Sequence, residues 1–87
     1  MTVLSDVVTS DGRPFDPSLY RVVLRPLSAA DGGGWLATLP ELPGCTGDGE
    51  TEMDAIKDAR LAAIEWAHAA IADGENVPSA HNAVAAQ

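Results

Sequence analysis

The chain has 87 residues, enough for one small domain with one hydrophobic core, which excludes an enzyme with a separate cofactor-binding domain. Thirteen acidic residues against five basic ones give a net charge of −8 and a pI near 4.3, which argues against a surface that binds nucleic acid through its phosphates. Apolar residues make up 46% of the chain, but many of them are Ala, so the core is thin and we expect a dimer or a larger oligomer.

The N-terminal extension, residues 1–18, alternates short apolar groups with turn formers such as DGRP at 11–14 and DPS at 16–18. We expect it either to pair as an edge strand or to stay mobile. It lacks a basic start and a long apolar run, so no signal peptide is predicted. No stretch is long enough to span a membrane, and a single Cys favours a reducing compartment, so we expect a cytoplasmic protein.

Two β-strands are predicted next in the chain. Residues 19–27 place Tyr20, Val22 and Leu24 on one face, and Pro26 ends the strand because it has no N–H for a ladder. A turn at 28–34 contains DGGG, whose glycines accept positive φ, and leads to a second strand at 35–39. The two strands are expected to form a hairpin with one apolar face. The turn-rich residues 40–50 leave room for a short third strand at 45–48.

A long helix is predicted over residues 52–73. Thr51 is the expected N-cap with Asp54 three residues later, and Gly74 is the expected C′ residue. We expect Ile56 and Trp66 to supply most of the bulk of the packed face. At about 100° per residue the apolar arc comprises Met53, Ile56, Ala59, Ala63, Trp66, Ala67, Ala70 and Ile71, and the opposite arc holds Lys57, Asp58, Glu65 and His68. Residues 79–87 form a tail that we expect to be frayed or ordered only in an assembly.

No catalytic, cofactor-binding or metal-binding residues are predicted. The alternating acids of 48–54 space their oxygens as a calcium loop does, but Met53 stands where that loop needs Gly and Ala59 where it needs Glu. Cys45 as a nucleophile would need a His base, and nothing places His68 or His81 near it, so a small buried hydrophobe is the better interpretation.

Most of the net negative charge lies between residues 41 and 58. Six acids against Lys57 give −6 + 1 = −5 in this segment. Such a surface would steer a basic partner toward it, whereas the plainer interpretation is that an acidic surface keeps the protein soluble. Charge alone leaves both interpretations open.

Several short motifs occur in a characteristic order along the chain. They are YRVVL at 20–24, GWLA at 34–37, LPELPGC at 39–45, DGET at 48–51 and DA at 54–55. In this series the chain resembles the HicB family of antitoxins over residues 19–78. The resemblance implies an α+β fold of β-β-β-α-β order, described as a partial RNase H-like fold without a working nuclease site. A small antiparallel sheet of three to four strands would be covered by one long helix.

The resemblance also implies a function. HicB-like proteins bind and neutralise HicA-like toxins, which are small basic RNases, and an acidic surface suits such a partner. The family usually carries a C-terminal DNA-binding module, whereas this sequence ends soon after Gly74, so we expect no direct binding of an operator. The exposed acids predicted to contact the toxin are Asp48, Glu50, Glu52, Asp54 and Asp58.

Two other functions stay open at this point. The first is a homo-oligomeric scaffold or small-ligand-binding module of the same fold without a toxin partner, which the missing DNA-binding module favours mildly. The second is a cation-dependent nuclease that uses Asp48 and its neighbours, for which the sequence offers less support. A neighbouring reading frame encoding a basic protein would favour the antitoxin, because an inhibitor needs its target.

Overall fold

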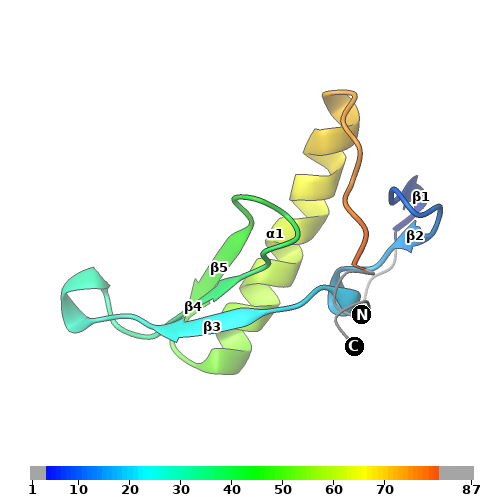
Figure 1. The fold of residues 1–87 in the computed structure, drawn as a ribbon. Helices are drawn as coiled ribbons and strands as arrows, with labels where there is room; N and C mark the ends of the chain where they lie inside the picture. Colours follow the sequence, from blue (N-terminus) through cyan, green and yellow to red (C-terminus); the bar gives the residue numbers. More distant parts are fainter. Residues whose placement is uncertain (1–3, 81–87) are drawn as a thin grey trace.

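A long helix lies against a three-stranded antiparallel sheet, and a separate two-stranded sheet stands beside the C-terminal half of the helix (Figure 1). The computed structural model describes residues 4–80, with side chains from Val7 onward. The elements in chain order are β1 (Leu4–Val8), β2 (Pro14–Phe15), the 3-10 turn η1 (Pro17–Leu19), β3 (Val23–Pro26), the 3-10 turn η2 (Ala29–Asp31), β4 (Trp35–Thr38), β5 (Thr46–Gly49) and α1 (Glu52–Ala72).

The sheet of β3, β4 and β5 confirms the predicted hairpin and third strand. Leu24 pairs with Ala37, which pairs with Gly47 on the other side. Tyr20 is buried and Leu24 half-buried, while Arg25 on the alternate face is exposed, as the alternation predicts. The α+β fold class is therefore confirmed, with α1 behind β4 and β5 in Figure 1.

The first sheet strand begins later than predicted, at Val23 and not at residue 19. Asp16 accepts a hydrogen bond from the N–H of Ser18 at 2.9 Å and caps η1, whose first residue is Pro17. This cap turns the chain before it can enter the sheet. The ladder then starts at the pair Val23 and Thr38, because β4 extends no further.

The described part of the N-terminal extension pairs as strands, but in a sheet of its own. β1 and β2 pair with each other and do not join the β3–β4–β5 sheet. Gly12, at φ +83°, allows the tight turn between them, in which its N–H donates to the Thr9 carbonyl at 2.9 Å. Val7 and Phe15 of this unit are buried in the core.

Both helix ends are where the sequence predicts them, within one residue. The Thr51 hydroxyl oxygen accepts the N–H of Asp54 at 3.1 Å. At the other end Gly74, at φ +75°, donates to the Ile71 carbonyl at 3.0 Å, and the next N–H, of Glu75, donates to the Ala70 carbonyl at 2.8 Å. These two bonds form a Schellman motif, which satisfies the carbonyls of Ala70 and Ile71 in the last turn of α1.

The packed face of α1 covers only part of the predicted arc, whose residues 59, 63, 67 and 70 are buried as predicted. Met53 is 61% exposed and Ile71 49% exposed, and neither packs in the core. Ile56 and Trp66 are half-buried, so they do not supply most of the bulk. The fully packed positions of the helix are all Ala, namely Ala55, Ala59, Ala63, Ala67 and Ala70. The larger buried side chains come from outside the helix: Phe15, Leu39, Leu42 and Val77.

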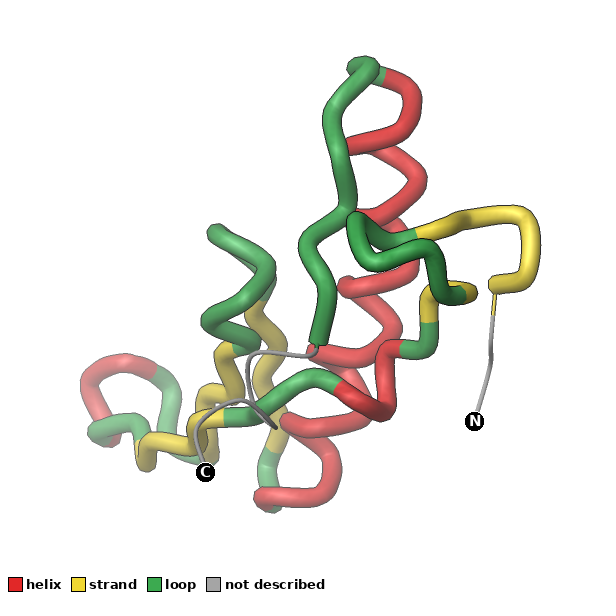
Figure 2. Tube along the Cα trace, turned by 45° about the vertical axis from the view of Figure 1, so that its right-hand side comes forward, coloured by secondary structure: helices red, strands yellow, loops and turns green. Residues whose placement is uncertain are grey.

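The predicted last strand is absent from the described residues. After α1 the chain runs back alongside the helix (Figure 2) and makes a single parallel bridge between Val77 and Thr9. The Ser10 N–H donates to the Val77 carbonyl at 2.9 Å, but Pro78 has no N–H to continue a ladder. The sheet therefore has three strands, and the last strand of the β-β-β-α-β order is reduced to this bridge.

Candidate partner-binding surface

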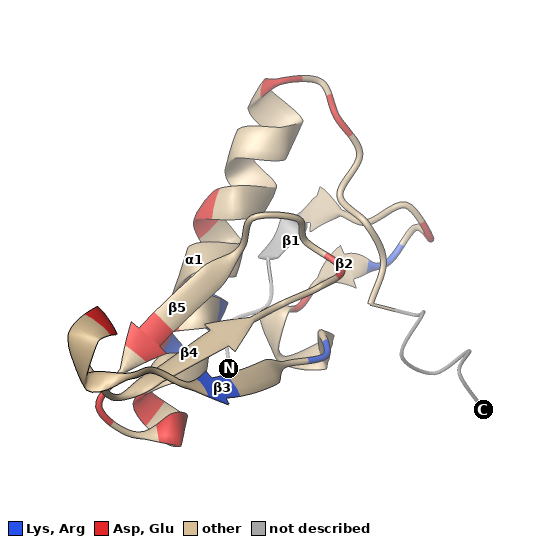
Figure 3. Ribbon diagram, turned by 60° about the vertical axis from the view of Figure 1, so that its left-hand side comes forward, with Lys and Arg blue, Asp and Glu red and all other residues tan. Residues whose placement is uncertain are grey.

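The five acids predicted to contact a toxin gather where β5 leads into α1. Asp48 lies on β5, Glu50 in the connection, and the other three on the first two turns of α1. All five are exposed. Figure 3 shows acidic residues along the end of β5 and the start of the helix, on one side of the molecule. The sequence-predicted residues are therefore brought together on one exposed surface, which we call the acidic junction (Asp48, Glu50, Glu52, Asp54 and Asp58).

One contact joins the strand and the helix within the acidic junction. The backbone N–H of Asp48 donates to Oδ2 of Asp58 at 3.0 Å. β5 has β4 on one side only, so its other edge carries backbone groups that need partners. Asp58 satisfies one of these groups, and its carboxylate is thereby held in a fixed position.

Two members of the acidic junction lie at the positive end of the dipole of α1. Glu52 and Asp54 lie in the first turn of α1, where free N–H groups and the helix dipole stabilise negative charge. The described ion pairs join Arg13 to Asp11 and Arg21 to Glu41, so no member of the acidic junction takes part in one. In the described part of the chain, the carboxylates of the junction are therefore exposed and free of ion pairs.

The DGGG hairpin turn borders the acidic junction, which the sequence analysis did not predict. Gly34 lies so close to Gly49 that a Cβ on it would stand 3.2 Å from the Gly49 carbonyl carbon. Gly32 and Gly33 line a shallow hollow with Asp48 and Glu50. The turn also carries Asp31, which is exposed and lies in η2. The run of three glycines was the available signal, because it predicts a close approach of backbones as well as a turn.

The PELPGC segment has a structural role. The side chain of Glu41 is 8% exposed, and its Oε2 pairs with Nε of Arg21 at 3.5 Å. The indole N–H of Trp66 donates to the Pro43 carbonyl at 2.8 Å, which fixes the same loop to α1. Glu41 therefore contributes to the position of the loop and does not belong to the acidic junction.

The nucleophile candidates are not placed for catalysis. Cys45 is buried, its Sγ lies 3.6 Å from the Ala59 carbonyl oxygen, and burial raises the pKa of the thiol. His68 is exposed on α1, and His81 lies outside the described residues. Within residues 4–80 no group of three or more His, Cys, Asp or Glu side chains could hold a metal ion.

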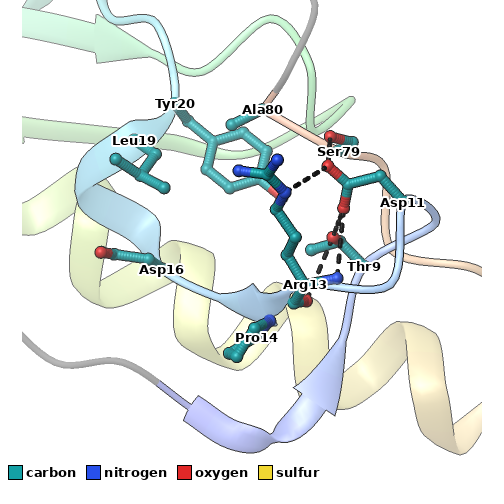
Figure 4. Close-up of a pocket in the computed structure, with 9 residues that line it drawn as sticks. All are labelled: Thr9, Asp11, Arg13, Pro14, Asp16, Leu19, Tyr20, Ser79 and Ala80. Atoms are coloured by element: carbon teal, nitrogen blue, oxygen red, sulfur yellow. Dashed lines mark hydrogen bonds and ion pairs between the residues drawn. The ribbon is translucent and has the colours of Figure 1, made fainter.

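A pocket beside Tyr20 is lined by residues from two segments that are far apart in the sequence, 9–20 and 79–80 (Figure 4). Asp11 accepts a hydrogen bond from the Ser79 hydroxyl at 2.8 Å and also bonds Thr9 and the N–H of Arg13. The Tyr20 hydroxyl donates to the Pro78 carbonyl. These bonds hold Pro78 and Ser79 against residues 9–20, and Ser79 is the first residue of the predicted tail; residues 81–87 of that tail lie outside the described residues.

Together these features define a small acidic α+β domain with an exposed carboxylate surface at one end of its helix. The chain matches the family model of the HicB-like antitoxin of bacterial toxin–antitoxin systems over residues 20–87, and it belongs to that family. The resemblance stated from the sequence is thereby confirmed. Neither the curated proteins nor the solved structures gave a match. In the described part of the chain, no helix is long and apolar enough to cross a membrane.

Proposed function

We propose that this antitoxin neutralises a small basic HicA-like RNase by direct contact through the acidic junction. The observation that supports the proposal most is that five exposed acids converge from β5 and α1 with no ion pair among the described residues. A basic toxin binds RNA through its cationic surface, so carboxylates that pair with that surface exclude the phosphates. In this proposal the antitoxin competes with RNA for the cationic surface of the toxin and catalyses no reaction. We place this activity in the cytoplasm, where the toxin meets its RNA.

The first test is co-expression with the product of the neighbouring reading frame that encodes a small basic protein. We expect growth rescue and a stable complex on size-exclusion chromatography with light scattering. A toxic neighbour that is neither rescued nor bound would refute the proposal for this pair and would favour the homo-oligomeric scaffold.

The second test locates the contact by charge reversal. Glu50→Lys with Glu52→Lys changes the charge of the acidic junction by four units, and we expect toxin affinity to fall by at least about tenfold at low salt. The matched control is Asp73→Lys with Glu75→Lys, an equal change among exposed acids at the far end of α1. Circular dichroism checks that both proteins remain folded, because Glu52→Lys also removes a favourable charge from the helix N-terminus. Equal affinities of the two double variants would remove the acidic junction from the interface.

A further inference from the structure

A groove on the outer side of α1 is lined mainly by apolar side chains. Met53 is 61% exposed and Leu61 64% exposed. With half-buried Ile56 and Ile64 and with Pro17 of η1 they line a groove of about 540 Å³. These helix positions lie on a different side of α1 from the buried Ala residues. Sites for small molecules in proteins have volumes of about 300 to 1,000 Å³ and mostly apolar walls, so the groove has the size and the lining of such a site.

Two cations form the charged part of the groove. Lys57 and Arg60 line it, and neither has an ion pair among the described residues. Nε of Arg60 is buried and has no hydrogen-bond partner in the described part of the chain. An unsatisfied buried donor costs free energy, and a carboxylate that binds the guanidinium through two oxygens supplies the missing acceptor. Because apolar side chains surround the donor, this bond is stronger than the same bond in water.

From these two properties we infer that the groove binds a small amphipathic carboxylate, of the class of a medium-chain fatty acid. The aliphatic chain of the ligand lies along Met53 and Leu61. Its carboxylate accepts hydrogen bonds from Arg60, with the ammonium group of Lys57 beside it. This site is separate from the acidic junction, and its existence does not depend on the proposed toxin.

Larger partners suit the groove less well. A standard protein interface involves about 20 to 30 residues on each side, whereas the groove is formed by η1 and three turns of one helix. A second copy docked by two-fold symmetry would set Lys57 and Arg60 against the same two cations. A basic toxin would meet the same repulsion. The small carboxylate is the occupant that complements both the apolar walls and the charge.

A two-dimensional NMR titration of the isotope-labelled 87-residue protein with octanoate tests the inference. We expect saturable shifts confined to η1 and residues 53–64, with a Kd of about 0.3 mM. Octanol has the chain without the charge, and acetate has the charge without the chain. Each should bind at least about tenfold more weakly than octanoate, because each makes only one of the two kinds of contact.

Two pairs of variants locate the ligand. Arg60→Met keeps an apolar stem but removes the guanidinium, and we expect octanoate to bind at least about tenfold more weakly. Its matched control is Arg25→Met, at an exposed arginine of β3, which should bind as wild type does. Leu61→Asp removes apolar area and repels the carboxylate, so binding should be lost. Its control is Ile71→Asp, on the same helix outside the groove (49% exposed). Circular dichroism checks that all four proteins fold.

Several results would overturn the inference. One is the absence of saturable shifts with octanoate up to about 5 mM, and another is octanol binding as tightly as octanoate. Equal affinities of Arg60→Met and Arg25→Met, or of Leu61→Asp and Ile71→Asp, would place the ligand elsewhere. Octanoate binding that weakens as the protein concentration is raised would show that a second copy, and not a small carboxylate, occupies the groove.

Discussion

Gly47 on β5 lies directly against the backbone of Ala59 on α1. A Cβ on Gly47 would stand 2.6 Å from Cα of Ala59, closer than folded proteins allow. One turn earlier on the helix, a Cβ on Gly49 would meet the N–H of Ala55 at 2.7 Å. The helix can lie on the strand at this distance only because both surfaces lack side-chain bulk there, and the Ala face is therefore the one that packs.

The first prediction concerns this close contact. Gly47→Ala should lower the free energy of unfolding by about 3 kcal/mol, because either the strand or the helix must move and the packed Ala face separates from the sheet. Urea denaturation followed by circular dichroism measures it. Thr46→Ala, at an exposed position of the same strand, is the control and should cost less than about 1 kcal/mol. Similar midpoints for the two variants would show that β5 and α1 are not held as closely as described.

The second prediction concerns Tyr20, which is buried and donates its hydroxyl to the Pro78 carbonyl. Burial first, then the charges of Asp11 and Glu41, raise the pKa of Tyr20 from its ordinary value of 10 to about 12. The folded protein thus favours the neutral phenol. The neutral Tyr20 phenol therefore makes its full contribution to the free energy of unfolding below pH 10. This contribution is lost as the pH rises from 10 to about 12, because Tyr20 ionises in that range only in the unfolded chain.

Tyr20→Phe separates these effects. At pH 7 it should unfold at lower urea by about 1 kcal/mol, because the Pro78 carbonyl loses its donor. The difference between the variant and wild type should shrink as the pH is raised from 10 toward 12. A constant difference over that range would mean that Tyr20 ionises alike in the folded and unfolded chains.

The third prediction concerns the link between the N-terminal extension and residues 77–80. Hydrogen bonds from Thr9 and Ser79, opposed in part by desolvation, lower the pKa of Asp11 below its ordinary value of 3.8. A lowered carboxyl pKa contributes stability that is present above the unfolded value and is lost as the pH falls through the folded value. Asp11→Asn should therefore unfold at lower urea than wild type at pH 7, and this difference should close as the pH falls below about 3.8.

Asp31→Asn is the matched control for Asp11→Asn. Asp31 is exposed, and among the described residues its hydrogen bonds go to Ser28 of its own turn, so its replacement should leave the midpoint nearly unchanged. Hydrogen exchange gives a local measurement of the same link: the Ser10 N–H, which donates to Val77, should exchange faster in Asp11→Asn than in Asp31→Asn. Equal exchange rates of the Ser10 N–H in the two variants would show that Asp11 does not stabilise this link.

The limits of the helix and the faces of the strands were predictable because they depend on near neighbours in the chain. Thr51 caps the N–H three residues later, and Gly74 alone at that end supplies the positive φ of a Schellman motif. The alternation around Leu24 follows from the period of an extended strand. The acidic junction was predictable for a related reason, since its members span only eleven residues of sequence, 48–58.

Only the tertiary structure decided how far the buried face of α1 extends and which residues distant in the chain are hydrogen-bonded. The periodicity of α1 predicted that Met53 and Ile71 would be buried, but both are exposed. The glycines of β5 set a distance between helix and sheet at which only Ala fits. Likewise Asp11 and Ser79 are 68 residues apart, and no local pattern encodes their bond. Local signals report the shape of one segment, whereas burial and long-range bonding depend on the surface that another segment presents, and that surface exists only after both have folded.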